Sequence, residues 1–360
     1  MLSLLNQNYP LAYALFFLVS VGFSLLINTL FLKFVRTLGI RNNDNETVIR
    51  WGSKSKPAVG GFSFYISFLL SIIAYSILFD SRQVFLNPQL IGILLATLLG
   101  FLLGLTDDAY NTKPLLKFTT QIACGFILLI TGTKINISSL EFINYSLTMI
   151  WIVGMMNSLN MLDNMDAITS LVCGAIICAV LTVISIHNEE ASVFYMINIG
   201  VLAAIIGFLK YNWHPSKMYM GDTGSQFLGV FMAAMSINFL WNADAPSGDI
   251  ISVKNFIIPV LAFIMPLSDT ATVVINRISK GSSPFIGGKD HTTHALAHTG
   301  MNDRKVAIVF LLVSLFSVVL IFIIEKMIAI WSHLYSVIFI AYIILVFSIL
   351  FKLTRKVMNN

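Results

Sequence analysis

The chain has 360 residues, of which 57% are hydrophobic and 11% are charged, and its mean hydropathy is +0.85. A soluble core could not bury so much apolar surface, so this composition predicts an all-α integral membrane protein and excludes an ordinary soluble enzyme. The formal net charge of +5 is explained by basic residues that set membrane orientation and attract anionic lipid, so no nucleic acid is expected as a partner.

A helix needs roughly 20 apolar residues to cross the ~30 Å hydrocarbon core of a bilayer. The apolar stretches of this chain predict a polytopic bundle of about eleven transmembrane helices in one domain, residues 1–360, without internal repeats. No basic segment precedes the first stretch, so we expect a retained helix rather than a cleaved signal peptide. The helices are expected near 11–33, 59–79, 89–106, 114–132, 143–157, 167–186, 192–209, 224–240, 255–276, 306–324 and 334–351.

Lys and Arg residues divide unequally between the two sides of this bundle. Counting alternate loops places eighteen on one side and four on the other. Because basic residues stay cytoplasmic, we expect the N-terminus outside, the C-terminus in the cytoplasm and the protein in the cell inner membrane. The active site is expected in the loops that then face the cytoplasm, near 34–58, 107–113, 157–166, 210–223 and 277–305.

The third predicted helix ends in two adjacent acids, Asp107 and Asp108, after the run GFLLGLT. Neighbouring helical residues point about 100° apart, so one carboxylate could hold a metal while the other contacts a substrate. A solvated helix end is the simpler alternative. On the next helix Lys117 and Gln121 share a face, and Lys117 could bind a phosphate or extend to the membrane interface.

A polar stripe ends the fifth predicted helix, where Asn157, Asn160, Asp163 and Asp166 recur every three residues in NSLNMLDNMD. In a helix they would share one face, and amides with acids suit recognition of hydroxyl groups or a nucleobase edge. A solvated loop would explain the same residues.

The segment KMYMGDTGSQFLG places Asp222 just before the eighth predicted helix, between glycines that permit close backbone approach. Asp222 is a candidate Mg²⁺ ligand, because this ion often takes one or two carboxylates and completes its octahedron with water and phosphate oxygens. An N-cap aspartate is the alternative.

Three histidines, His291, His294 and His298, follow Lys289 in GGKDHTTHALAHTG. Because no HExxH pattern is present, a zinc site is less favoured than a histidine pair that faces phosphate.

Two further charged features complete the set. Lys54 and Lys56 precede a Gly-Gly turn and form a candidate phosphate clamp, although the cytoplasmic bias of basic residues explains them almost as well. Asp269 lies inside the ninth predicted helix and is expected to face the bundle interior, with Arg277 or a polar neighbour on another helix as its partner.

The sequence resembles the polyprenyl-phosphate N-acetylhexosamine-1-phosphate transferases, glycosyltransferase family 4, along nearly its whole length. Each motif alone is weak, but the ordered set is specific. The final HTTH is closer to the undecaprenyl-phosphate N-acetylglucosamine-1-phosphate transferase branch than to the phospho-N-acetylmuramoyl-pentapeptide transferases, which typically show three consecutive histidines. The resemblance rests on KSKPAVGG, GLTDDAYN with Lys117, NSLNMLDNMD, YNWHPSKMYMGDTGS, PLSDT and KDHTTH.

The resemblance implies transfer of a sugar-1-phosphate, expected to be N-acetylhexosamine-1-phosphate, from a UDP-sugar to polyprenyl (undecaprenyl) phosphate. The products would be UMP and a polyprenyl-diphosphate-sugar that initiates cell-envelope glycan synthesis. The implied cofactor is Mg²⁺, with Mn²⁺ as an alternative, and a homodimer is compatible with it. Direct attack by the lipid phosphate and a double displacement through an aspartyl-phosphate both remain open.

The resemblance also assigns residues by position. The implied metal ligands are Asp222 and Asp108. The implied catalytic residues are Asp107, Asp108, His291 and His294. The implied substrate-binding residues are Lys54, Lys117, Asn160, Asp163, Asp166, Asn212, Tyr219 and Lys289. Three positions depart from the family pattern: Asn164 and Ala167 follow the acids where glycine is usual, and Thr293 stands where histidine is expected.

A multi-span secondary transporter is the main alternative function. Its polar residues would form a binding site near the middle of the bilayer, between repeats. In this chain the charges gather at one face and no repeat is visible, which favours the enzyme. An intramembrane metalloprotease or metal-ion carrier that uses the three histidines is a more distant alternative.

Overall fold

The computed structural model describes residues 9–38, 56–79, 81–243, 253–283, 288, 290–328 and 330–358. Within these ranges the chain is a helical bundle whose only β pairing is an isolated bridge between Ala58 and Tyr219. The all-α class predicted from composition is confirmed.

Each of the eleven predicted apolar segments is helical. Nine helices of the described chain are long and apolar enough to cross a membrane, or ten if one bent pair counts as a single span. The remaining predicted span is the shorter apolar helix α5. The helices are α2 (Tyr9–Leu38), α3 (Gly61–Leu78), α4 (Pro88–Tyr110), α5 (Pro114–Ile130), α6 (Glu141–Leu162), α7 (Ile168–Ile186), α8 (Val193–Asn212), α9 (Gly221–Ser236), α10 (Val253–Ala262), α11 (Ile264–Ser279), α12 (Thr292–His298), α13 (Asp303–Phe322) and α14 (His333–Met358). A 3₁₀ turn, η1 (Arg82–Leu86), precedes α4, and two π-helical turns, η2 (Ile237–Trp241) and η3 (Ile323–Met327), extend α9 and α13.

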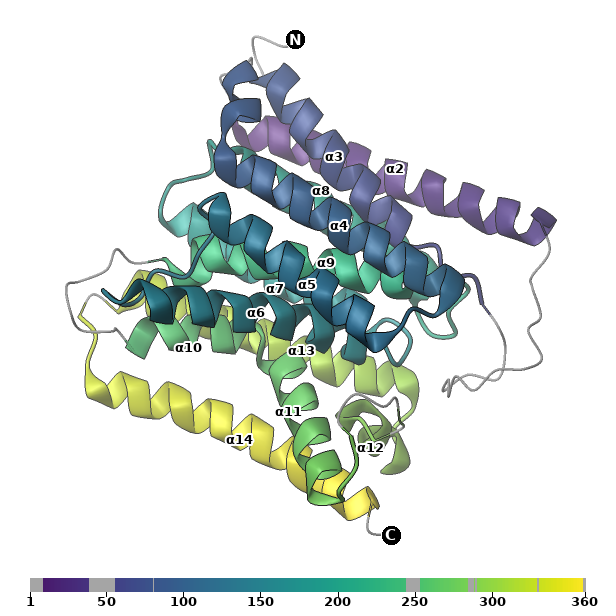
Figure 1. Ribbon diagram of the computed structural model, residues 1–360, viewed down its shortest axis with the longest axis vertical. Helices are drawn as coiled ribbons and strands as arrows, with labels where there is room; N and C mark the ends of the chain where they lie inside the picture. Colours follow the sequence, from purple (N-terminus) through teal and green to yellow (C-terminus); the bar gives the residue numbers. More distant parts are fainter. Residues whose placement is uncertain are drawn as a thin grey trace.

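The ninth predicted span, 255–276, is not one straight helix. It consists of α10 and α11, which meet at 85° at Phe263. Pro266 explains the break, because proline has no N–H to donate to the Ala262 carbonyl and its ring would clash with that carbonyl. The bend turns α11 away from the direction of the neighbouring helices, toward the C-terminal end of α14 and the short helix α12 (Figure 1).

The remaining long helices lie side by side, with α9 in the interior and α2 and α14 at opposite edges (Figure 1). Burial follows this order, since 94% of the apolar window of α9 is buried but only 17% of the windows of α2 and α14. The outer helices expose large apolar side chains such as Leu18, Val19 and Val337. This exposure suits contact with lipid, and the chain is a multi-pass membrane protein.

Polar contacts gather at the two ends of the bundle. One end contains a buried Glu325, whose oxygens lie 2.9 Å from both His187 Nε2 and Lys254 Nζ. The opposite end, where α4, α6 and α8 finish and α5, α7, α9 and α13 begin, contains the acidic residues singled out from the sequence.

The turn between α6 and α7 has an unusual backbone at its last residue. Ala167 is in the left-handed region (φ 69°, ψ −16°) and only 1% exposed. Its N–H donates to Asn212 Oδ1 at 3.1 Å, and the same oxygen accepts from Ser170 Oγ at 3.0 Å. The Asn212 amide thus fixes the conformation in which glycine would carry no steric penalty.

We expect Ala167→Gly to cost little, because relief of about 1–2 kcal/mol of left-handed strain offsets the lost buried methyl and the greater freedom of the unfolded chain. Ala167→Val should lower the free energy of unfolding by about 2 kcal/mol or more, since a β-branched residue is least tolerated there. Thermal unfolding in detergent measures both. Ala204→Gly, at a fully buried site within α8, is the matched control and should cost about 1 kcal/mol. Equal losses for the two glycine variants would contradict this account.

Candidate active site

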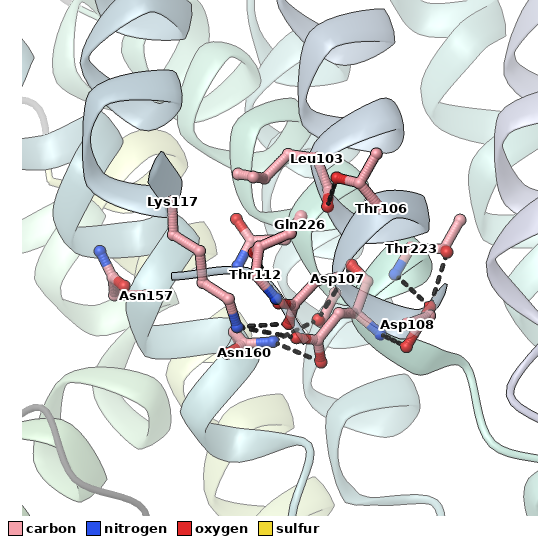
Figure 2. Close-up of polar contacts among 12 residues, drawn as sticks. Leu103, Thr106, Asp107, Asp108, Thr112, Lys117, Asn157, Asn160, Thr223 and Gln226 are labelled. Atoms are coloured by element: carbon pink, nitrogen blue, oxygen red, sulfur yellow. Dashed lines mark hydrogen bonds and ion pairs between the residues drawn. The ribbon is translucent and has the colours of Figure 1, made fainter. Parts of the chain in front are cut away.

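Four helices bring charged and amide side chains together at the acidic end. Asp107 and Asp108 lie in the last turn of α4, Lys117 in the first turn of α5, Asn160 near the end of α6 and Asp222 in the first turn of α9. Figure 2 shows that the side chains of Asp107, Asp108, Lys117 and Asn160 converge. Asp222 lies 105 residues from Lys117 and 114 residues from Asp108 in the sequence, so the bundle, not the local chain, assembles the cluster.

Lys117 is the cation of this cluster. Its Nζ forms ion pairs with Asp107 Oδ2 and, at 3.3 Å, with Asp222 Oδ2. The other oxygen of Asp222 accepts from Asn160 Nδ2 at 3.0 Å, and Asn160 Nδ2 also donates to Ser225 Oγ at 2.9 Å. Lys117, Asn160 and Asp222 are all partly exposed, so a ligand can reach them.

Asp108 binds the start of α9. Its Oδ1 accepts from the Asp222 N–H at 2.9 Å, and its Oδ2 accepts from the N–H and the hydroxyl of Thr223 at 2.9 and 2.7 Å. These donors have no partner within α9, and the positive end of its helix dipole favours the negative charge. Asp108 therefore caps α9 from a neighbouring helix, and the two adjacent acids of α4 contact different partners.

Close backbone approach makes this cap possible. A Cβ at Gly104 would lie 2.1 Å from the Asp222 carbonyl oxygen, and a Cβ at Gly221 would lie 2.6 Å from Asp108 Oδ2. Gly221 also has a positive φ of 75°, which few other residues adopt. The glycines beside Asp222 thus serve the packing of α9 against α4.

Four aspartates at this end make the same contact, which we call a carboxylate clasp: the carboxylate accepts both the backbone N–H and the side-chain hydroxyl of a single Ser or Thr. The clasps join Asp107 to Thr112, Asp108 to Thr223, Asp166 to Ser216 and Asp269 to Thr292. In the described part of the chain, no backbone N–H donates to the carboxylates of Asp163 or Asp222. Those two acids therefore keep the most capacity to bind something else.

The acidic turn after α6 divides its two acids. Asp166 is buried, clasps Ser216 and accepts from His214 Nδ1 at 3.1 Å, while Lys56 Nζ lies 3.7 Å from its Oδ2. Asp163 is partly exposed. Burial, and then the nearby negative charges of Asp222 and Asp108, raise the pKa of Asp163 to about 8.

Asn212 and Tyr219 flank the segment that Asp166 holds. Asn212 is 3% exposed, and its amide is used within the fold by Ala167, Ser170 and the Met218 carbonyl. The ring of Tyr219 is partly exposed and lies 5.0 Å from Lys56 Nζ. Of the two, Tyr219 is the one that a substrate can contact directly.

The histidines belong to α12, which α11 anchors. Asp269 is completely buried, clasps Thr292 and binds His291 Nδ1 at 2.9 Å. His291 and His294 are buried with their rings 5.5 Å apart, whereas His298 is exposed. Lys54 and Lys289, the other expected substrate ligands, lie outside the described residues.

Of the two partners expected for Asp269, a polar neighbour on another helix is confirmed, in Thr292 and His291 at the start of α12, and Arg277 is wrong. Arg277 instead donates to both oxygens of Asp290, at 2.7 and 2.6 Å. Eight residues span about 12 Å of helix, so two side chains on α11 at that spacing cannot meet.

The sequence analysis missed Gln226, which lies beneath the cluster beside Gln121. Gln121 and Gln226 lie one turn deeper than Lys117 and Asp222, and Gln121 Nε2 donates to Gln226 Oε1 at 3.3 Å. Asn157 Nδ2 donates to Gln121 Oε1 at 2.7 Å, which completes an amide layer from α5, α6 and α9. The spacing of four residues from Asp222 was the available signal for Gln226.

Comparison with known proteins agrees with this arrangement. The sequence model described as glycosyl transferase family 4 matches residues 90–240, which include Asp107, Lys117, Asn160 and Asp222. Over these residues the chain is similar to glycosyl transferase family 4. It is therefore an enzyme, and the transporter alternative is not favoured.

Members of this family resemble the chain over different lengths. It is 27% identical over 342 residues to the protein of Bacillus subtilis named "Probable undecaprenyl-phosphate N-acetylglucosaminyl 1-phosphate transferase", covering 92% of the chain and 88% of the relative. It is 24% identical over 279 residues to the decaprenyl-phosphate N-acetylglucosaminephosphotransferase of Mycobacterium tuberculosis, covering 71% and 69%. The match to the phospho-N-acetylmuramoyl-pentapeptide-transferase of Staphylococcus saprophyticus, 31% over 205 residues, covers 50% and 61%. The longer matches to the first two names confirm the predicted branch.

The enzyme offers oxygen donors to a metal ion. Among the described residues no three His, Cys, Asp or Glu side chains form a metal-binding group. The neighbouring carboxylates, whose charges add to the effect of burial in raising the pKa of Asp163, nevertheless fit a hard cation that binds one or two carboxylates and takes its other ligands from water and phosphate.

We expect the Asp163→Asn transferase to be more stable than the wild-type protein at high pH in cation-free buffer. Since the folded-state pKa of Asp163 (about 8) exceeds its usual value of 3.8, its stabilising contribution is complete below pH ~4 and is lost as the pH rises through ~8. The difference in thermal unfolding temperature should therefore be near zero at pH 4 and largest above pH 8. Millimolar Mg²⁺ should reduce it. A pH-independent difference would contradict the assignment.

Proposed function

We propose that the enzyme transfers N-acetylglucosamine-1-phosphate, or a closely related N-acetylhexosamine-1-phosphate, from a UDP-sugar to polyprenyl phosphate. The observation that carries this proposal is Lys117, placed between Asp107 and Asp222 where the apolar helices end. A lipid phosphate and a nucleotide diphosphate are both anionic, and both could reach a cation at this depth. The names of the relatives support the same substrates.

The reaction is a phosphoryl transfer in a single displacement. A phosphate oxygen of the lipid attacks the sugar-linked phosphorus of the donor, and the bond from that phosphorus to the bridging oxygen breaks. UMP leaves with the bridging oxygen, and polyprenyl-diphosphate-sugar remains. Such transfers depend mainly on positioning and charge neutralisation. Lys117 supplies one positive charge on the enzyme, and Asn160 orients Asp222.

A Mg²⁺ ion, or Mn²⁺, would neutralise charge on the donor diphosphate when it is bound. Asp222 is the ligand that we favour, because its carboxylate contacts only side chains in the described structure. Asp107 is the second ligand that we favour, because its Oδ2 shares Lys117 with Asp222 while only its Oδ1 accepts from Thr112. Both oxygens of Asp108 already accept hydrogen bonds from α9, so its role is to orient Asp222 and, at most, to share the ion.

The nucleotide sugar is assigned to the acidic turn and the neighbouring loop. Asp163 and Tyr219 are partly exposed there, and Lys56 lies over the Tyr219 ring. Asp166 and Asn212 are proposed to act through the backbone that they hold, rather than by direct contact. Lys54, Lys289, His291 and His294 remain candidates for phosphate or sugar contacts.

The distribution of basic residues supports a cytoplasmic position for this site in the cell inner membrane, where nucleotide sugars are available. A homodimer is compatible with the proposal, since the site described above draws all of its side chains from one chain.

The direct test is a reconstituted assay with UDP-N-acetylglucosamine, undecaprenyl phosphate and Mg²⁺. We expect UMP release that depends on both substrates and stops with EDTA. The absence of UMP with every UDP-N-acetylhexosamine tried would contradict the proposed function.

Lys117→Met should lower kcat by about 100-fold or more, because removal of one preorganised charge commonly costs about 2.7–4 kcal/mol of transition-state stabilisation. Lys117→Arg, which keeps the charge, should retain more activity. Lys134→Met is the matched control, since Lys134 pairs with Glu141 at the opposite end of the bundle. Activity of Lys117→Met within a few-fold of wild type would refute the role of Lys117.

A further inference from the structure

Two residues at which the chain departs from its family pattern contact each other. Asn164 lies in the acidic turn, directly after Asp163, and Thr293 is the second residue of α12. Thr293 Oγ1 donates to Asn164 Oδ1 at 2.6 Å, across 129 residues of sequence. Thr293 is completely buried, and the Asn164 amide is oriented by a second bond from its Nδ2 to the Met161 carbonyl at 2.9 Å.

This hydrogen bond joins two parts of the site that are otherwise anchored separately. Asp269 holds the start of α12 against α11 through Thr292 and His291. The acidic turn is held against the loop after α8 through Asp166 and Ser216. The Asn164 to Thr293 bond connects the turn to α12 directly.

The position of Thr293 in α12 explains how this hydrogen bond can affect the histidines. Thr293 lies between His291 and His294, so fixing its side chain also sets the rotation of α12 and the direction of both histidine rings. Asn164 is next to Asp163, the acid without a clasp. The bond thus relates the histidines to the part of the acidic turn that is open to a ligand.

We propose that Asn164 and Thr293 are a pair of positioning residues, which hold the histidines of α12 in register with the acidic turn during sugar-phosphate transfer. This rests on the proposed function. Glycine at 164 would offer no side-chain acceptor to the Thr293 hydroxyl, so the contact depends on the amide of Asn164.

A double-mutant cycle on kcat/KM tests the pair. Thr293→Val and Asn164→Ala should each lower kcat/KM by about two- to tenfold, the range expected for one hydrogen bond. The kcat/KM of the double variant should be no lower than that of the less active single variant, because both substitutions remove the same hydrogen bond. Thr293→Ser keeps the hydroxyl and should stay within twofold of wild type, which a requirement for the buried methyl alone would not give.

Thr29→Val is the matched control, since it removes a hydroxyl bond of equal length, 2.6 Å to Tyr211, between α2 and α8. It should leave kcat/KM unchanged. Multiplicative effects of Thr293→Val and Asn164→Ala, or a Thr293→Ser enzyme as impaired as Thr293→Val, would overturn the proposal.

Hydrogen exchange separates failure of this proposal from failure of the proposed function. Asn164→Ala should accelerate exchange of the backbone amides of α12, although the substitution lies outside that helix. Unchanged exchange in α12 would overturn the positioning role, whether or not the enzyme releases UMP. A wild-type protein that releases no UMP, with accelerated exchange in Asn164→Ala, would refute only the proposed function and the catalytic part of this inference.

Discussion

The contact between Asp108 and the first turn of α9 is the interaction on which the rest of the acidic end depends. The interior helix α9 has to begin where α4 ends, and its first N–H groups need acceptors. Asp108 supplies them, while Gly104 allows the two backbones to approach closely. A carboxylate at a helix N-terminus typically stabilises the helix by about 0.3–1 kcal/mol at an exposed site. The main role of Asp108 here is geometric, because its bonds to α9 fix the direction of the Asp222 side chain.

The clasped and unclasped aspartates divide the work of the site. A carboxylate that accepts both an N–H and a hydroxyl holds a loop or a helix end, as Asp166 holds Ser216 and Asp269 holds Thr292. Asp222 and Asp163 have no such partner in the described chain, and they face the accessible side of the bundle. Anionic phosphates can approach such acids only with cations present, and Lys117 is one. The same end thus combines rigid support with carboxylates left available for a ligand and its metal ion.

The sequence predicted the membrane helices and the polar end well, for a physical reason. Apolar length and the positions of charged residues are local properties, and they reported all eleven helical segments. The bend between α10 and α11 was also signalled locally, by Pro266, but an apolar count does not register it. The distribution of Lys and Arg placed the loops from Asp107 to Asp222 at one face, whereas the roles of single residues within that site came from a family resemblance.

Pairings between distant residues could not be predicted in this way. Arg277 and a polar neighbour on another helix were both possible partners of Asp269, and only the packed structure shows that Asp269 binds Thr292 and His291, because partner choice depends on how α11 crosses the other helices. The bonds from the Asn212 amide to Ala167 and to the Met218 carbonyl were likewise not predicted. The sequence pattern indicates the helix face on which a residue lies, whereas the packing of the bundle determines which residues that face contacts.

The thermal unfolding of Asp108→Asn compared with that of Asp222→Asn tests the division between clasped and available acids most directly. Asp108→Asn replaces an acceptor of two α9 N–H groups and should lose about 1–2 kcal/mol of stability. Asp222→Asn should remain within about 1 kcal/mol of the stability of the wild type. The lost ion pair with Lys117 is offset because Asp222 no longer repels the carboxylates of Asp107, Asp108 and Asp163. An unchanged Asp108→Asn beside a strongly destabilised Asp222→Asn would contradict the account.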